Sequence, residues 1–355
     1  MDSLIENWIQ RIAEAARTGR ALAIRGGGSK DFYGGPARGE PFEVAAYSGI
    51  VAYEPTELVV TVRAGTPLVD LAAVLAAKGQ CLAFEAPHFG PSATVGGMLA
   101  AGLSGPRRPA VGAVRDFVLG VKILNGIGEV LSFGGQVMKN VAGYDVARLM
   151  AGSLGTLGVV LEVSLKVLPL PVAEKSLSFV LDETTALARL NQWAGQPWPI
   201  SASAWNDGVL TLRLSGAAAA VAAAQRTLGG ELLSDAEGGA FWQSLREQEH
   251  EFFNGGEALW RLSLPSTAPA QTLGRTLIEW GGAQRWLRSG DPTSIRAASA
   301  SVGGHATLFR GDDALKASVG VFQPLGEPLA RIHRRLKQAF DPHGVFNPGR
   351  MYPDF

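Results

Sequence analysis

Apolar and polar positions alternate with a helical period at the start of the chain and with a strand period soon afterwards. In residues 1–20, MDSLIENWIQRIAEAARTGR, apolar side chains recur three or four positions apart among charged ones, which predicts an amphipathic helix rather than a signal peptide. Residues 57–65 predict a strand that ends at a glycine. Residues 67–79 predict a helix, because proline stands near its first turn and glycine just past its end.

The next hundred residues continue this alternation of strands and helices. Residues 116–135, DFVLGVKILNGIGEVLSFGG, predict two strands joined by a turn that contains Asn-Gly. Residues 141–153 predict a short helix, and residues 157–169 a long strand. Such alternation favours an α/β arrangement over a β-sandwich or a helix bundle.

The pattern breaks at Pro169 and Pro171, and the composition changes beyond them. The second part combines an alanine-rich helix at residues 217–224 with short strands such as VLTLRLS and LWRLSLP. A final helix is expected from residue 331, followed by an irregular segment rich in proline and glycine. We therefore expect three parts, residues 1–172, 173–330 and 331–355.

Composition excludes several classes of protein. Of 355 residues, 46% are hydrophobic, which indicates a globular chain long enough for two cores. Lys plus Arg equals Asp plus Glu, so no electrostatic field of one sign favours nucleic acid or an anionic membrane. Cys81 is the single cysteine, so neither a disulfide nor an iron-sulfur cluster can be held by this chain alone. The apolar runs are too short for a membrane span, and a cytoplasmic location is expected.

A glycine-rich stretch at residues 23–35, AIRGGGSKDFYGG, is the first candidate for chemistry. Consecutive glycines let backbone amides form a concave nest for an anion. The order of residues matches neither the P-loop of nucleotide hydrolases nor the dinucleotide fingerprint. Taken alone, the stretch favours a plain turn, in which Ser29 and Lys30 are ordinary turn residues.

Two further glycine clusters change this interpretation. They lie at residues 87–108, PHFGPSATVGGMLAAGLSGPRR, and in YDVARLMAGSLGTLGVVLEVSLKVLP after residue 143. With residues 23–35, they resemble the FAD-binding domain of the vanillyl-alcohol oxidase superfamily, the PCMH-type fold. GPRRP, MKNVAGYD, GGHATLF and GVFNPGRMY further resemble the FAD-binding E subunits of bacterial glycolate oxidases from end to end. This resemblance implies an α+β fold, with a two-part PCMH-type domain followed by a smaller α+β cap domain and a C-terminal segment that returns to the first.

The resemblance also implies which residues contact FAD. The first loop is matched by residues 25–30, the second by residues 94–105, and the last signature by residues 152–159. The implied cofactor-binding residues are Arg25, Gly26, Gly27, Gly28, Ser29, Lys30, Thr94, Gly96, Gly97, Ala101, Gly102, Gly105, Gly152, Ser153, Gly155, Gly158 and Val159. Many superfamily members attach FAD through a histidine in the first loop; here Ser29 and Lys30 stand there, so a noncovalent flavin is expected. Cys81 precedes the second covalent position and is expected to be a buried strand residue.

Oxidation of a 2-hydroxy acid by a flavin needs a cation for the carboxylate and a base for the hydroxyl proton. Arg107, Arg108 and Arg350 are the candidate cations, with surface salt bridges as the alternative for the first two. His305 is the candidate base, whereas His88 could line the flavin site. The metal-binding stretch of related dehydrogenases is reduced here to Gly-Gly-His, so no metal site is expected.

The family resemblance implies a place in glycolate catabolism. We expect the FAD-binding subunit of a heteromeric glycolate oxidase, a dehydrogenase that oxidises glycolate to glyoxylate with a D-type flavoprotein subunit and an iron-sulfur subunit. The inner face of the membrane would then be reached through those partners. Two alternatives stay open: a structural subunit whose FAD fold serves mainly as an interface, and a self-sufficient flavin oxidase.

Overall fold

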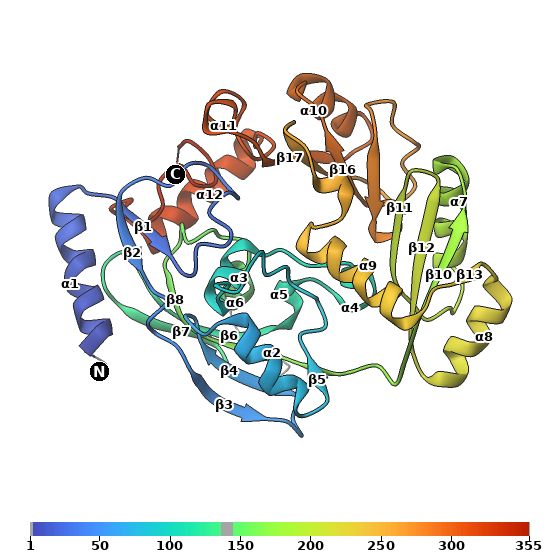
Figure 1. Ribbon diagram of the computed structural model, residues 1–355. Coiled ribbons are helices and arrows are strands. Elements are labelled where there is room, and N and C mark those ends of the chain that lie inside the picture. The colour runs from blue at the N-terminus through green and yellow to red at the C-terminus, as the bar shows by residue number, and fades with distance from the viewer. Residues whose placement is uncertain (1–2, 136–144, 355) are drawn as a thin grey trace.

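The computed structural model describes residues 3–135 and 145–354, so the motif MKNVAGYD lies outside it except for Asp145. Two large β-sheets stand side by side, and the C-terminal segment returns to the first strands of the chain (Figure 1). Within the described ranges, no helix combines the length and the apolar composition that a bilayer crossing needs.

The first half is built on a five-stranded antiparallel sheet of order β3-β4-β8-β6-β7. Its strands are β3 (Ile50–Glu54), β4 (Val59–Arg63), β8 (Val159–Lys166), β6 (Val118–Leu124) and β7 (Val130–Gly134). The expected hairpin is confirmed, because β6 pairs antiparallel with β7. The α/β arrangement favoured by the alternation is wrong, because every pair of neighbouring strands in this sheet is antiparallel. Helix α2 (Leu68–Ala76) leads from β4 out of this sheet.

Smaller elements flank this sheet. Helix α1 (Ser3–Thr18) is amphipathic as expected and buries Ile5, Trp8, Ile12 and Ala15. Beside it β1 (Leu22–Arg25) and β2 (Glu40–Glu43) pair in parallel, and β5 (Gln80–Cys81) pairs with β9 (Leu168–Pro169). Cys81 is thus in a strand, but its side chain is half-buried rather than buried. The remaining short helices are α3 (Val95–Ala101), α4 (Arg108–Val111), α5 (Val114–Phe117) and α6 (Val146–Leu149).

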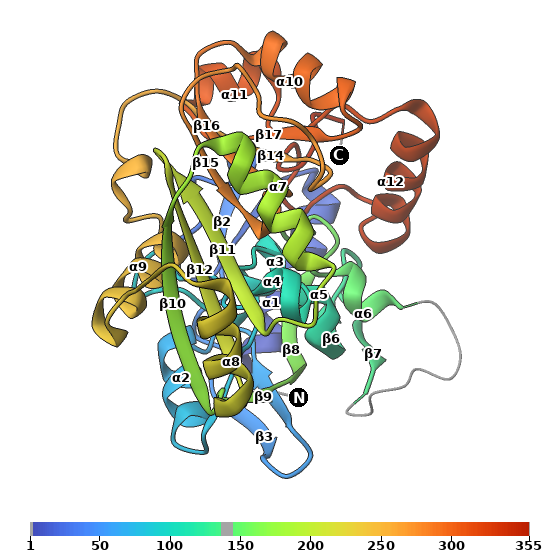
Figure 2. The same cartoon turned by 90° about the vertical axis from the view of Figure 1, so that its right-hand side faces the viewer.

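The second half is an eight-stranded antiparallel sheet of order β13-β10-β12-β11-β15-β16-β14-β17. The strands are β10 (Ala173–Val180), β11 (Ile200–Asn206), β12 (Val209–Gly216), β13 (Glu231–Leu232), β14 (Leu259–Ser263), β15 (Thr276–Glu279), β16 (Gln284–Arg288) and β17 (His305–Arg310). Helices α7 (Glu183–Ala194) and α8 (Ala218–Leu228) cover the outer face of β10, β11 and β12 (Figure 2). Helix α9 (Asp235–Glu247), the 3₁₀ turns η1 (Glu251–Phe253) and η2 (Trp280–Gly282), and α10 (Pro292–Ser301) complete this half.

A shared core and a partly buried ion-pair network hold the two halves together. Tyr33, Leu103 and Leu154 of the first half pack in one cluster with Trp286 and Phe309 of the second. Such a cluster fixes the relative position of the two sheets because each half would otherwise expose large apolar side chains.

The chain ends with α11 (Asp313–Val319), α12 (Glu327–Phe340) and an irregular segment. Helix α12 begins four residues before the predicted position 331, because Pro328 fits the first turn, where no intrahelical donor is needed. Phe346 then packs beside Leu22 of β1 and forms an isolated parallel bridge with it. The C-terminal segment therefore lies against the strand that precedes the glycine-rich stretch.

Candidate functional site

The glycine loop, residues 26–30, follows β1 and is half-buried. Its backbone amides donate no hydrogen bond to a protein acceptor within the described chain. Gly28 has a φ of +74°, and a Cβ on Gly27 would lie 1.4 Å from the carbonyl oxygen of Ser92. Side chains are thus excluded at these positions, and a row of bare amides remains, which is the arrangement that binds an anion.

A cleft of about 80 Å³ opens over the glycine loop; we call it the glycine cleft. Its far wall comes from α3, where Thr94 caps the helix by accepting a hydrogen bond from the amide of Gly97 at 3.1 Å. Gly97 therefore lies in the first turn of a helix, and Thr94 is the residue just before that helix begins. The predicted cofactor residues that line this cleft are Arg25, Gly26, Gly27, Gly28, Ser29, Lys30, Thr94, Gly97 and Ala101.

The C-terminal segment closes one side of the glycine cleft. The Arg350 guanidinium lines it and donates to the carbonyl oxygens of Gly35 and Asp31, the latter at 2.9 Å. Burial lowers the pKa of Arg350, but a guanidinium keeps its charge. Arg350 therefore brings a positive charge to a cleft whose glycine loop lies more than three hundred positions earlier in the sequence.

Asn347 is a residue that sequence reasoning missed. Its Oδ1 accepts from the amide of Ile24 at 2.7 Å, and its Nδ2 donates to the carbonyl of Leu154 at 2.7 Å. It also has a φ of +44°, an uncommon backbone conformation that Asn tolerates better than most residues. The signal in the sequence was Asn-Pro-Gly, a turn that needs such an Asn.

Lys30 occupies the end of the glycine loop. Its Nζ donates to the carbonyl oxygen of His88 at 3.1 Å and lies 5.5 Å from the centre of the Phe89 ring. Burial lowers the pKa of Lys30 to about 8, although Glu247 opposes this shift. Lys30 is thus mainly charged at neutral pH, beside the row of amides.

The other predicted cofactor residues lie outside the lining of the glycine cleft. Several let two chain segments approach each other: a Cβ on Gly102 would lie 2.8 Å from the amide of Gly152, and one on Gly105 would lie 2.2 Å from the carbonyl of Glu85. Val159 begins β8 and is buried. The set comprises Gly96, Gly102, Gly105, Gly152, Ser153, Gly155, Gly158 and Val159. In this structure, several of these glycines allow chain segments to pack closely, and none of the set lines the glycine cleft.

Arg107 lies away from the glycine cleft, in the network that joins the two halves. Its guanidinium pairs with Glu174 at 3.1 Å, and its amide donates to Glu85 at 2.9 Å. Arg213 completes the network, contacting Glu85 at 2.9 Å. Because both carboxylates are committed to these arginines, the position of Arg107 corresponds to a structural ion pair rather than to a substrate-binding cation.

His305 lines a second cleft of about 280 Å³, which we call the arginine cleft. Its walls come from both halves: Gly102 and Arg108 contribute from the first, Arg261 and Gln284 from the second. Ala101 lines the glycine cleft and Gly102 the arginine cleft, so the two clefts adjoin at the end of α3.

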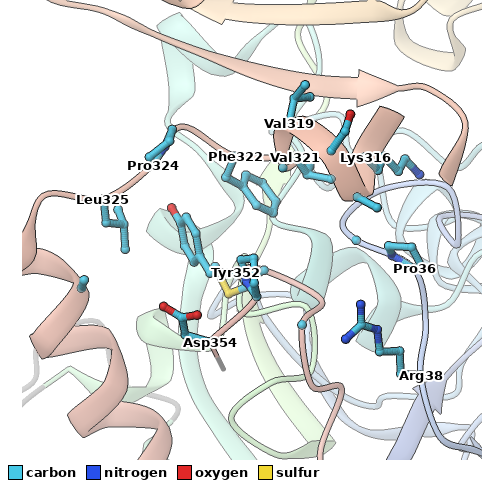
Figure 3. Close-up of a pocket in the computed structure, with 18 of the residues that line it drawn as sticks. Pro36, Arg38, Lys316, Val319, Val321, Phe322, Pro324, Leu325, Tyr352 and Asp354 are labelled. Carbon is cyan, nitrogen blue, oxygen red and sulfur yellow. The ribbon is translucent and has the colours of Figure 1, made fainter. Parts of the chain in front are cut away.

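A third cleft, of about 490 Å³, lies between the C-terminal segment and the loop after α11 (Figure 3). Phe322, Val321 and Tyr352 give it an apolar side, and Arg38 and Asp354 a charged rim. Gly349 and Met351 line this cleft, whereas the side chain of Arg350 between them lines the glycine cleft. One stretch of backbone thus separates the two.

The residues of the glycine cleft fit part of an FAD molecule. Unpaired amides, Lys30 and Arg350 suit a diphosphate, because several donors share its charge. The volume of about 80 Å³ is below the range of roughly 300–1,000 Å³ that holds a whole small ligand, so the cleft by itself accounts for the diphosphate alone. In the described ranges, no three His, Cys, Asp or Glu side chains are grouped as metal ligands.

Comparisons with known proteins agree with this geometry. Residues 5–134 match the family described as FAD binding domain. The chain is 49% identical over 348 residues to "Glycolate oxidase subunit GlcE" of Escherichia coli (strain K12), which covers 98% of this chain and 97% of that protein. It is 32% identical over 140 residues to "Glycolate oxidase subunit GlcD" of Bacillus subtilis (strain 168), covering 39% of this chain and 30% of the other.

A solved structure of alkyldihydroxyacetonephosphate synthase matches 96% of this chain and 74% of its own length, with a TM-score of 0.65 and 14% sequence identity. That likeness shows the fold. The identity to the E subunit extends along nearly the whole of both chains, which a shared cofactor domain alone does not produce. The chain therefore belongs to the family of glycolate oxidase E subunits, FAD-dependent oxidoreductases with the PCMH-type fold.

Proposed function

We propose that this chain carries one FAD of a multisubunit glycolate oxidase and takes part in the oxidation of glycolate to glyoxylate. The single observation that carries this proposal is the row of unpaired amides in the glycine loop, in a chain that belongs to the E-subunit family. Glycolate gives up two electrons and two protons in this oxidation, and FAD, when bound, is a two-electron acceptor.

The residues of this chain would hold the cofactor without a covalent bond. The amides of residues 26–29 and the guanidinium of Arg350 face the same cleft and would bind the diphosphate. Ser29 and Lys30 stand in the loop where a histidine would be needed for attachment. Release of intact FAD on acid precipitation is the expected result.

Electrons are proposed to leave towards an iron-sulfur subunit. With Cys81 as its single cysteine, this chain cannot supply the roughly four thiolates of such a cluster. The partial likeness to the GlcD subunit of Bacillus subtilis supports a related D-type flavoprotein as a second partner. Any attachment to the inner face of a membrane would then be made by the partners.

The test is an absorbance spectrum of the purified full-length chain, followed by reconstitution with its partner subunits. We expect a flavin spectrum, FAD release on denaturation, and loss of both in a Gly27→Val variant, with Gly239→Val as the matched control. Gly239 is an exposed residue of α9, and a Cβ there meets no atom within 4 Å. A colourless, correctly folded wild-type chain contradicts the proposal.

The small volume of the glycine cleft favours a second candidate, a structural subunit whose FAD fold serves as an interface. In that case the Gly27→Val chain assembles with its partners, and the complex oxidises glycolate at the wild-type rate. Loss of turnover in an assembled complex excludes this candidate.

A further inference from the structure

The arginine cleft has a ligand-binding geometry that the proposed function leaves unused. One wall is a row of residues on neighbouring strands: Gln284 of β16 pairs with Ser263 of β14, which pairs with His305 of β17. Directly paired residues of antiparallel strands project from the same face of a sheet. Arg261 precedes Ser263 by two positions, so its side chain projects from that face as well.

Positive charge in this cleft lacks a neutralising partner. Within the described ranges, neither Arg108 nor Arg261 forms an ion pair within 4.0 Å of a carboxylate. Arg261 donates instead to the hydroxyl of Tyr33 at 3.2 Å, and Arg108 lies 4.4 Å from the centre of the Trp280 ring. Burial, then Arg115 and Arg261, lower the pKa of Arg108, so these cations repel one another across the cleft. An anion would relieve that repulsion.

Polar groups beside the arginines add hydrogen bonding. Burial and the charge of Arg261 lower the pKa of His305, so its imidazole is neutral at pH 7 and can accept a proton or a hydrogen bond. The amide nitrogen of Gln284 donates to Glu279 at 3.0 Å, which leaves the Gln284 oxygen as an acceptor at the cleft. A neutral imidazole also carries one N–H, so a ligand hydroxyl can accept from His305 and donate its single proton to the Gln284 oxygen. With two guanidinium groups beside them, these groups suit a ligand that presents a carboxylate and a hydroxyl together.

We propose that the arginine cleft binds a small 2-hydroxy acid, with Arg261 and Arg108 on its carboxylate and His305 and Gln284 on its hydroxyl. A volume of about 280 Å³ lies at the lower end of small-molecule sites, which limits the ligand to a few carbon atoms. The inference rests on the proposed function for the substrate class, and it gives this chain a substrate-binding site of its own.

A ligand that cannot be oxidised separates binding from turnover. 2-Hydroxyisobutyrate has the carboxylate and the hydroxyl but no α-hydrogen, and pivalate replaces the hydroxyl by a methyl group of similar size. Isothermal titration calorimetry on the FAD-loaded full-length chain should show 2-hydroxyisobutyrate binding at least tenfold more tightly than pivalate. A tenfold ratio corresponds to about 1.4 kcal/mol, which two hydrogen bonds between uncharged groups account for, one donated and one accepted by the hydroxyl.

Variants of the cleft residues test which side chains contact the bound acid. Arg261→Gln should weaken 2-hydroxyisobutyrate binding about tenfold or more, whereas Tyr33→Phe, which removes the partner of Arg261 but keeps its charge, should change it less than twofold. His305→Ala should bring the affinities of 2-hydroxyisobutyrate and pivalate closer together. Arg226→Gln, an exposed charge change on α8, is the matched control. If Arg261→Gln does not fold, Arg261→Lys should still show weaker binding, since it keeps the charge but loses the planar fork.

The outcomes distinguish this inference from the proposed function. An FAD-loaded wild-type chain that binds neither acid, or an Arg261→Gln chain of normal FAD content that binds as wild type does, overturns the inference and leaves the proposed function standing. A wild-type chain without FAD overturns the proposed function whether or not the acid binds.

Discussion

Replacing Lys337 by methionine should destabilise the protein and loosen the wall of the glycine cleft. The Nζ of Lys337 donates to the carbonyls of Thr156 at 2.8 Å and Phe346 at 2.7 Å, and to the carboxylate of Asp341 at 2.7 Å. Both charged side chains are buried, with exposed fractions of 7% and 1%. Lys337 thus ties α12 to the segment that contains Asn347.

The magnitude follows from what the substitution leaves behind. Removing one partner of a buried ion pair typically costs about 3–5 kcal/mol, because the other charge remains buried. Asp341 keeps two backbone donors, the amides of Val345 and Phe346 at 3.0 and 2.8 Å, so we expect the lower end, about 3 kcal/mol. Burial lowers the pKa of Lys337 against the opposing effect of Asp341, which shows that the charged lysine depends on this partner.

Urea denaturation of Lys337→Met, followed by intrinsic fluorescence, measures the loss in the free energy of unfolding. Lys78→Met, at an exposed position just after α2, serves as the control. FAD content at equal protein concentration should also fall, because Phe346 adjoins Asn347. A loss below 1 kcal/mol with an unchanged dependence on urea refutes the reasoning.

Three further predictions concern other sites. Gly28→Ala should reduce FAD occupancy about tenfold, because a φ of +74° costs alanine about 1–2 kcal/mol and a Cβ there displaces the Arg25 side chain; flavin absorbance per chain measures it, and wild-type occupancy contradicts it. Burial raises the pKa of Glu279 to about 7, so the folded state binds the extra proton and stability should fall as pH rises from about 4.5 to 7. Over that pH range the loss in the free energy of unfolding is on the order of 3 kcal/mol, and it should disappear in Glu279→Gln. An unchanged pH dependence of unfolding contradicts the assignment. Arg213→Met should lower the free energy of unfolding by about 3 kcal/mol, because it leaves the Glu85 carboxylate between the halves without this arginine partner. A melting temperature equal to that of wild type contradicts this prediction.

Local patterns predicted much of the first half. The strand at β4, the helix at α2 and the hairpin of β6 and β7 depend on periodicity and turn residues that are contiguous in sequence. Pairing order did not follow from these signals: β8 lies between β4 and β6, and only long-range packing selects that neighbour. The α/β arrangement suggested by alternation was wrong for this reason.

The sequence allows a candidate site to be predicted where neighbouring residues of one loop form it. It does not where the contacting residues are far apart in sequence. The glycine loop shows its bare backbone in the sequence itself. Arg107 and Arg108 are adjacent in sequence and give the same signal. Glu174 of β10 pairs with Arg107, whereas Arg108 lines the arginine cleft. Arg261 gave no signal, because its role depends on the pairing of β14 with β16 and β17.

The tie between Asn347 and Ile24 has a consequence for biosynthesis. A ribosome makes the glycine loop more than three hundred positions before Asn347. A nascent polypeptide therefore lacks one side of the cradle until Asn347 has left the ribosome, and flavin capture is expected to follow that point rather than the folding of the first sheet.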